Sequence, residues 1–114
     1  MILNQEFTYI GKSSNLIGNF KFLGPTHLQG YLKGEITVEN AAKIVLEIGS
    51  VTEGTLHCFD LDIYGEFNGE IKSLGNVTIY PTAKLDGKVI SKSLEILPGA
   101  IVNMNGHTEE SSFA

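Results

Sequence analysis

The sequence contains no arginine, only one cysteine, and no apolar run that approaches the roughly 20 residues of a membrane span. Thirteen acidic residues outnumber the lysines and give a formal net charge of −5, so we expect no binding to nucleic acid. The single cysteine, Cys58, cannot form an internal disulfide, and no secretory signal is recognisable. These absences predict a cytoplasmic protein.

What the chain does contain is a strong β-strand alternation. Over residues 61–71, every odd position is apolar or glycine, and every even position is polar or tyrosine. Residues 77–89 repeat this pattern, with Pro81 at one of the odd positions. Because successive side chains of a strand point to opposite faces, both stretches are predicted to be strands with one buried face.

The pattern recurs along the chain at a regular interval. Apolar pairs open successive repeats at positions 26, 44, 61, 77 and 94, with a mean spacing of about 17 residues. A hairpin array would need two-residue turns, and the one Asp-Gly pair, at 86–87, falls inside a strand-like run. The five pairs are Thr26/Leu28, Ile44/Leu46, Leu61/Ile63, Val77/Ile79 and Leu94/Ile96.

This spacing fits an all-β parallel β-helix, in which each inward side chain stacks on its counterpart one coil away. The apolar alternation continues over nine to thirteen residues and then breaks, which favours a right-handed solenoid of triangular cross-section over the left-handed type. Residues 39–48 include good helix formers, but Ile44 and Leu46 are in register with Val77 and Ile79, so a strand is predicted there. The six predicted coils cover about 9–20, 26–36, 44–56, 61–71, 77–89 and 94–106, between tails at 1–8 and 107–114.

Several of these motifs resemble the core of the bactofilins, which are polymer-forming bacterial cytoskeletal proteins. The motifs occupy residues 10–20, 28–36, 85–89 and 94–100, and the likeness extends over about residues 9–106. The resemblance implies a right-handed triangular β-helix that assembles end to end without nucleotide. It also implies a position on the inner face of the cell membrane, and a role in cell shape, in the placement of cell-wall enzymes or in polar organisation.

The ends of such a helix also point to self-association. A β-helix ends in exposed strand edges, which pair with another copy unless a cap covers them, and neither tail is long enough for a convincing cap. Stacking end to end, with like ends in contact, would bury these edges and give a filament without polarity. The candidate polymer interface consists of Leu16, Phe20, Phe22, Ile101, Val102, Met104 and Phe113.

The N-terminal tail has a second candidate role. Met1, Ile2, Leu3 and Phe7 are apolar and could touch a membrane, although the basic residues that usually support a weak anchor are absent before Lys12. A partly disordered tail, or one folded over the first coil, is the alternative. The expected partners are therefore other copies of the chain, with the inner membrane surface and cell-wall enzymes as further candidates.

Residues capable of chemistry are few and scattered. His27, His57 and His107 belong to different coils, and His27 and His57 occupy different repeat positions, so no metal site is predicted. Cys58 is adjacent to His57, but its place after Leu56 favours a packed thiol over a nucleophile. No glycine motif that cradles phosphate occurs. We predict no catalytic, cofactor-binding or metal-binding residues.

Two other functions stay open. An acyltransferase of the hexapeptide-repeat type would use a lone histidine as its base, but the required mark at every sixth position is missing. A module that does not polymerise could instead bind a partner through one flat β-face. Tyr31, Tyr64 and Tyr80 fall on outward positions and would form a tyrosine stripe on such a face.

Overall fold

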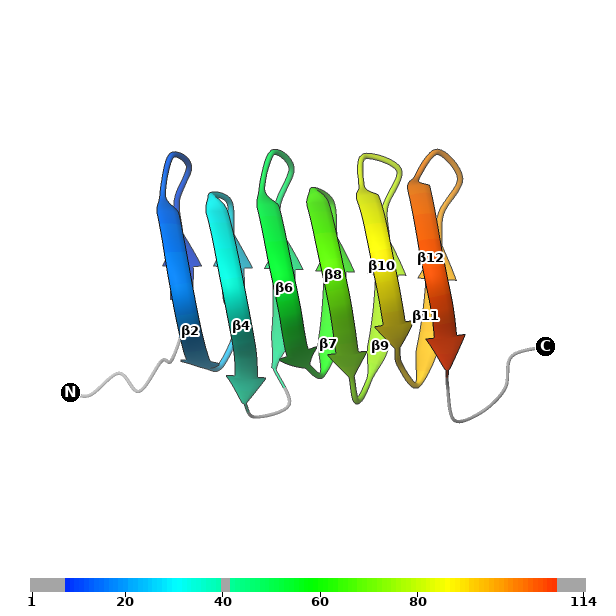
Figure 1. Ribbon diagram of the computed structural model, residues 1–114, viewed down its shortest axis with the longest axis horizontal. Helices are drawn as coiled ribbons and strands as arrows, with labels where there is room; N and C mark the ends of the chain where they lie inside the picture. Colours follow the sequence, from blue (N-terminus) through cyan, green and yellow to red (C-terminus); the bar gives the residue numbers. More distant parts are fainter. Residues whose placement is uncertain (1–7, 40–41, 109–114) are drawn as a thin grey trace.

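The computed structural model describes residues 8–39 and 42–108, and Figure 1 shows their arrangement. Within these residues the regular secondary structure consists of β-strands only. The strands are β1 (Thr8–Ile10), β2 (Asn15–Leu23), β3 (Thr26–Leu28), β4 (Tyr31–Glu39), β5 (Lys43–Leu46), β6 (Val51–Cys58), β7 (Asp60–Ile63), β8 (Glu66–Ser73), β9 (Asn76–Ile79), β10 (Lys84–Ile90), β11 (Ser93–Ile96) and β12 (Ile101–Thr108).

The strands form two parallel sheets. The short sheet has the order β1-β3-β5-β7-β9-β11, and the long sheet has the order β2-β4-β6-β8-β10-β12. One short strand followed by one long strand makes a coil, so the described residues wind through six coils, stacked side by side (Figure 1). This arrangement confirms the predicted β-solenoid.

The register of the short sheet follows the apolar pairs of the sequence. Thr26 and Leu28 pair with Ile44 and Leu46, and the same two rows continue through β7 and β9 to β11. Residues 43–46 are strand β5, so stacking against neighbouring coils overrides the helical preference of that segment, as predicted.

A row of glycines runs across the long sheet. Gly18, Gly34, Gly54, Gly69 and Gly87 pair in consecutive coils, and each has a positive φ between 118° and 146°. A positive φ interrupts the extended conformation, so each long strand bends at its glycine. The bend gives a coil three sides, one from the short strand and two from the long strand.

The last coil departs from the glycine row. Met104 pairs with Gly87, but the next residue, Lys88, pairs with Gly106, so the register shifts by one residue. Within the row, a Cβ at Gly87 would lie 2.8 Å from the carbonyl carbon of Gly69, which leaves no space for a side chain. A methionine in the sixth coil therefore requires a local change of the ladder, and the shift is a β-bulge.

The core consists of inward side chains stacked from coil to coil. Leu32, Thr52, Phe67 and Leu85 form one such row across four coils and are at most 1% exposed. Their counterparts in the outer coils, Leu16 and Val102, pack against the same core but stay half-buried. The core is therefore continuous along the axis, and it is open to solvent at both ends.

Candidate functional site: the two ends of the solenoid

Among the described strands, the four at the ends pair on one side only. Strands β1 and β2 form one end, and β11 and β12 form the other, so each leaves a row of backbone donors and acceptors facing along the axis. The free edges of β2 and β12 are the longest, because these strands have nine and eight residues. Such edges can pair with a further strand.

At the N-terminal end, the predicted residues lie together. Leu16, Phe20 and Phe22 are on β2, face inward and are half-buried, since no preceding coil covers them. The rings of Phe20 and Phe22 stack with centroids 6.2 Å apart. Ile17 and Leu23 on the same strand are 72% and 41% exposed, and both were missed by the sequence prediction. Both residues occupy outward positions of the repeat, where other coils carry polar residues. The sequence pattern therefore does not mark them as interface residues, and only the structure shows their exposure.

The C-terminal end is also apolar. Val102 faces inward and is half-buried, whereas Ile101 is 61% exposed and pairs with the exposed Lys84 on the outward side of the sheet. Ile96 of β11 is 42% exposed, although the equivalent Ile79 one coil earlier is fully buried. The backbone of Met104 lies in β12, whereas its side chain, and the whole of residues 109–114 with Phe113, are outside the described residues. The same holds for Met1, Ile2, Leu3 and Phe7.

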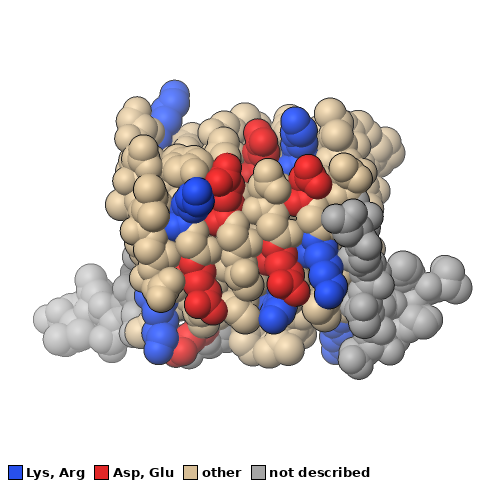
Figure 2. All heavy atoms as spheres, in the orientation of Figure 1, with Lys and Arg blue, Asp and Glu red and all other residues tan. Residues whose placement is uncertain are grey.

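The sides of the solenoid differ from its ends. Figure 2 shows lysine and acidic side chains interspersed over the central strands of the long sheet. The register places Glu66 beside Lys84 and Glu70 beside Lys88, so opposite charges face each other across neighbouring strands. A solvated face of mixed charge resists lateral association of sheets.

The three tyrosines of the predicted stripe do not lie on one face. Tyr64 and Tyr80 follow the short strands β7 and β9, and their rings stack with centroids 4.1 Å apart. A hydrogen bond with Tyr80 raises the pKa of Tyr64 above its ordinary value. Tyr31 is instead on the long sheet, where its hydroxyl donates to Glu53 Oε1 over 3.2 Å. The predicted stripe is therefore reduced to a stacked pair.

The histidines and the cysteine lie in separate environments. His27 Nδ1 is 2.6 Å from Glu47 Oε2, and His57 Nε2 is 3.4 Å from Glu35 Oε2. Among the side chains that the structure describes, which do not include that of His107, no group of three or more metal-ligating residues occurs. Burial raises the pKa of the Cys58 thiol to about 12, so it stays protonated at neutral pH, as a packed thiol would.

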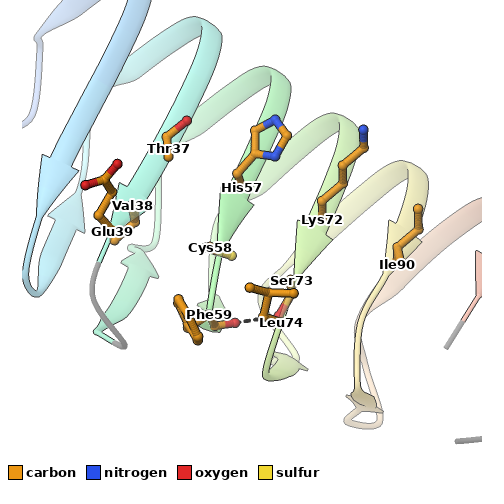
Figure 3. Close-up of a pocket in the computed structure, with 10 residues that line it drawn as sticks. All are labelled: Thr37, Val38, Glu39, His57, Cys58, Phe59, Lys72, Ser73, Leu74 and Ile90. Atoms are coloured by element: carbon orange, nitrogen blue, oxygen red, sulfur yellow. Dashed lines mark hydrogen bonds between the residues drawn. The ribbon is translucent and has the colours of Figure 1, made fainter. Parts of the chain in front are cut away.

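A groove of about 630 Å³ lies at one corner of the solenoid, where long strands end and the chain crosses to the next short strand (Figure 3). Buried Val38, Cys58 and Ser73 are among its lining residues, and the Ser73 hydroxyl donates to the carbonyl oxygen of Phe59. No motif in the sequence indicates this groove. The complete lining is Thr37, Val38, Glu39, His57, Cys58, Phe59, Lys72, Ser73, Leu74 and Ile90.

No helix able to cross a bilayer occurs in the part of the chain that the structure describes. A comparison with protein-family models matches residues 8–108 to Bactofilin, with the description polymer-forming cytoskeletal. Comparisons with curated proteins and with solved structures found no match. The matched range runs from the first residue of β1 to the last residue of β12 and so includes every coil and both open ends. The chain therefore belongs to the bactofilin family of polymer-forming cytoskeletal proteins.

Proposed function

We propose that this chain is a scaffold subunit that polymerises end to end, without nucleotide, into filaments that have no polarity. The observation that carries the proposal is the pair of open ends, where inward rows that are fully buried in the middle coils become half-exposed. Stacking a second copy on such an end pairs the free edges of the strands and covers the apolar rows in one step. The contact uses the same interactions that join coils within the subunit, so nucleotide energy is not needed.

The two ends favour contacts between like ends. Joining the last coil of one subunit to the first coil of the next would extend the glycine row from Gly87 through Met104 to Gly18. The register shift after Gly87 displaces the second half of β12, so the row cannot continue in register across that junction. Two different isologous contacts, one between N-terminal ends and one between C-terminal ends, avoid this mismatch and propagate a filament.

Arginine substitutions at the two ends test both assembly and polarity. Phe20 and Val102 both face inward at their ends, so a charge at either residue would have to be buried in the respective contact, which is unfavourable. If like ends meet, Phe20→Arg leaves dimers joined at the C-terminal end, Val102→Arg leaves dimers joined at the N-terminal end, and the double variant is monomeric. In a head-to-tail filament, each single variant would already be monomeric. Asn68→Arg, at an exposed position in the middle of the long sheet, is the matched control and should still polymerise.

The measurements are negative-stain electron microscopy of the purified protein without nucleotide, and light scattering coupled to size-exclusion chromatography. Circular dichroism establishes that each variant keeps its β-structure. Filaments that persist in the double variant would show that these ends are not the interface. Filaments that form only after a nucleoside triphosphate is added would contradict the nucleotide-independent part of the proposal.

In the cell, we propose that the filament acts in the cytoplasm as a support for cell shape or as a platform that positions cell-wall enzymes. Family membership and the mixed-charge face of the long sheet (Figure 2) support this role, because that face stays accessible when the ends are occupied. Contact of Met1, Ile2, Leu3 and Phe7 with the inner membrane surface would attach the filament there. Localisation of a fluorescent fusion of the wild-type chain and of the double variant would separate a role of the filament from a role of the subunit.

A further inference from the structure

The corner groove has apolar surface that the solenoid itself leaves uncovered. Leu74 on its rim is 71% exposed, although it is flanked by the buried Ser73. Phe59 and Ile90 add further half-exposed apolar surface from neighbouring coils (Figure 3). The groove therefore runs along the solenoid axis, across the ends of β4, β6, β8 and β10.

The N-terminal segment, residues 1–7, joins the solenoid at this same corner. The amide of Thr8 donates to the carbonyl oxygen of Pro25 over 2.9 Å, and Thr8 pairs with Thr26. Pro25 belongs to the connection between β2 and β3, which is the first-coil equivalent of the connections that flank the groove. The segment therefore begins one coil away from Val38, the first buried residue of the groove.

The length of the segment matches the distance to be covered. From the first coil to Leu74, at the end of the long strand of the fourth coil, there are three inter-strand spacings, or about 14 Å. Seven extended residues span about 23 Å. Leu3 or Ile2 can therefore reach Leu74, while Phe7 stays near the first two coils.

The composition of the segment also suits the groove. Met1, Ile2, Leu3 and Phe7 supply apolar side chains, and Glu6 is the only charge on a side chain. Lys72 on the groove rim offers an opposite charge to Glu6, whereas the groove carboxylate Glu39 already lies 3.6 Å from Lys21.

The C-terminal segment, residues 109–114, is a weaker fit. It also starts at this corner, because Thr108 pairs with Ile90. However, it opens with Glu109 and Glu110, which an apolar groove would have to desolvate, and Phe113 is its only large apolar residue.

We propose that residues 1–7 of each subunit lie in the corner groove of that same subunit and cover Phe59 and Leu74. Because the groove is on the side of the solenoid, this docking does not depend on the polymerisation proposed above. It also makes membrane contact by the same apolar residues competitive with docking, since one segment cannot bury its side chains in both places.

Photo-cross-linking of the full chain tests the proposal. Benzoylphenylalanine in place of Leu3 should form cross-links to the peptide that contains Phe59 and Leu74. An equal mixture of unlabelled and ¹⁵N-labelled protein, analysed by mass spectrometry, distinguishes cross-links within a subunit from those between subunits. Cross-links within the subunit are expected. Cross-links between subunits, cross-links to lipid alone when anionic vesicles are present, or none at the groove would each overturn the proposal.

Cys58 provides a second readout, because it is the single cysteine and lies in the groove lining. Leu3→Asp should weaken docking and increase the rate of Cys58 alkylation by about threefold or more, because the groove is uncovered. Phe113→Asp makes a comparable change in the C-terminal segment and should leave the rate unchanged. An increase with Phe113→Asp but not with Leu3→Asp would assign the groove to the C-terminal segment instead, and equal rates in all three proteins would show that neither segment covers it.

Discussion

The glycine row makes a sharp prediction about which glycines the solenoid requires. Gly54 lies in the middle of the row with a φ of +118°, and an added Cβ would lie 2.9 Å from the carbonyl carbon of Gly34 and closer still to its oxygen. Gly49 belongs to the same coil and also has a positive φ, of +89°, but no atom lies within 4 Å of the position of its Cβ. The two residues therefore separate backbone strain from steric conflict between coils.

The expected loss of stability has two causes, backbone strain and steric conflict between coils. Either alanine places a non-glycine residue in an unfavourable region of φ, which costs about 1 to 3 kcal/mol. Gly54→Ala must in addition push neighbouring long strands apart, and the loss of about two ladder hydrogen bonds adds ~2 kcal/mol. We expect Gly54→Ala to lower the free energy of unfolding by about 3 to 5 kcal/mol, a large part of the 5 to 15 kcal/mol typical of a domain. Gly49→Ala should lower the free energy of unfolding only by the cost of backbone strain, about 1 to 3 kcal/mol.

Urea denaturation followed by far-ultraviolet circular dichroism measures the difference. Each variant is measured at two protein concentrations, because self-association raises the apparent stability of the folded state. Gly18→Ala is a second control, since it lies in the row but the nearest atom to its Cβ is Phe20 Cζ at 3.9 Å. Equal destabilisation by Gly49→Ala and Gly54→Ala would refute the argument that the row is a steric interlock between coils.

Three further predictions concern the core. Thr52 places a buried hydroxyl without a hydrogen-bond partner between Leu32 and Phe67, so Thr52→Val should raise the free energy of unfolding by about 1 kcal/mol in the same urea assay. Phe67→Ala removes a fully buried ring and should cost about 3 to 5 kcal/mol, seen as a lower midpoint of thermal unfolding. The Cys58 thiol, whose pKa is raised from 9.0 to about 12, should be alkylated at pH 8 about a thousandfold more slowly in folded protein than in urea, as each pKa unit reduces the thiolate tenfold. Equal rates would show that the thiol is not buried.

The sequence predicts those features of the fold that follow from the regular spacing of apolar side chains. Ile44, Leu61 and Val77 repeat with the spacing of the coils, and stacking in a parallel solenoid converts that spacing directly into register. The same argument predicts a strand within residues 39–48 against their helical propensity, and residues 43–46 form β5.

Other features depend on contacts between coils, and the repeat spacing does not specify these contacts. Ile96 is exposed because no further coil covers it in the described residues, although its counterpart Ile79 is fully buried. The groove forms because the connections after β6 and β8 are short and place Phe59 and Leu74 side by side, a geometry that composition does not reveal. Tyr31 shares the outward parity of Tyr64, yet it lies on the other sheet, so parity alone could not predict a stripe.

The contrast between ends and sides explains why assembly and recruitment can be separate properties of one small solenoid. The ends repeat the chemistry of the interior, with free strand edges and half-buried apolar rows, which is why we propose that a second copy stacks there. The long-sheet side carries Glu66 opposite Lys84 and Glu70 opposite Lys88, so it is polar and solvated. Because the groove is on a side corner, the proposed docking of residues 1–7 there is compatible with occupied ends. Variants at Phe20 and Val102 should therefore change the length of the assembly, whereas variants at Leu3 or Leu74 should change what the groove binds and leave the length unaltered.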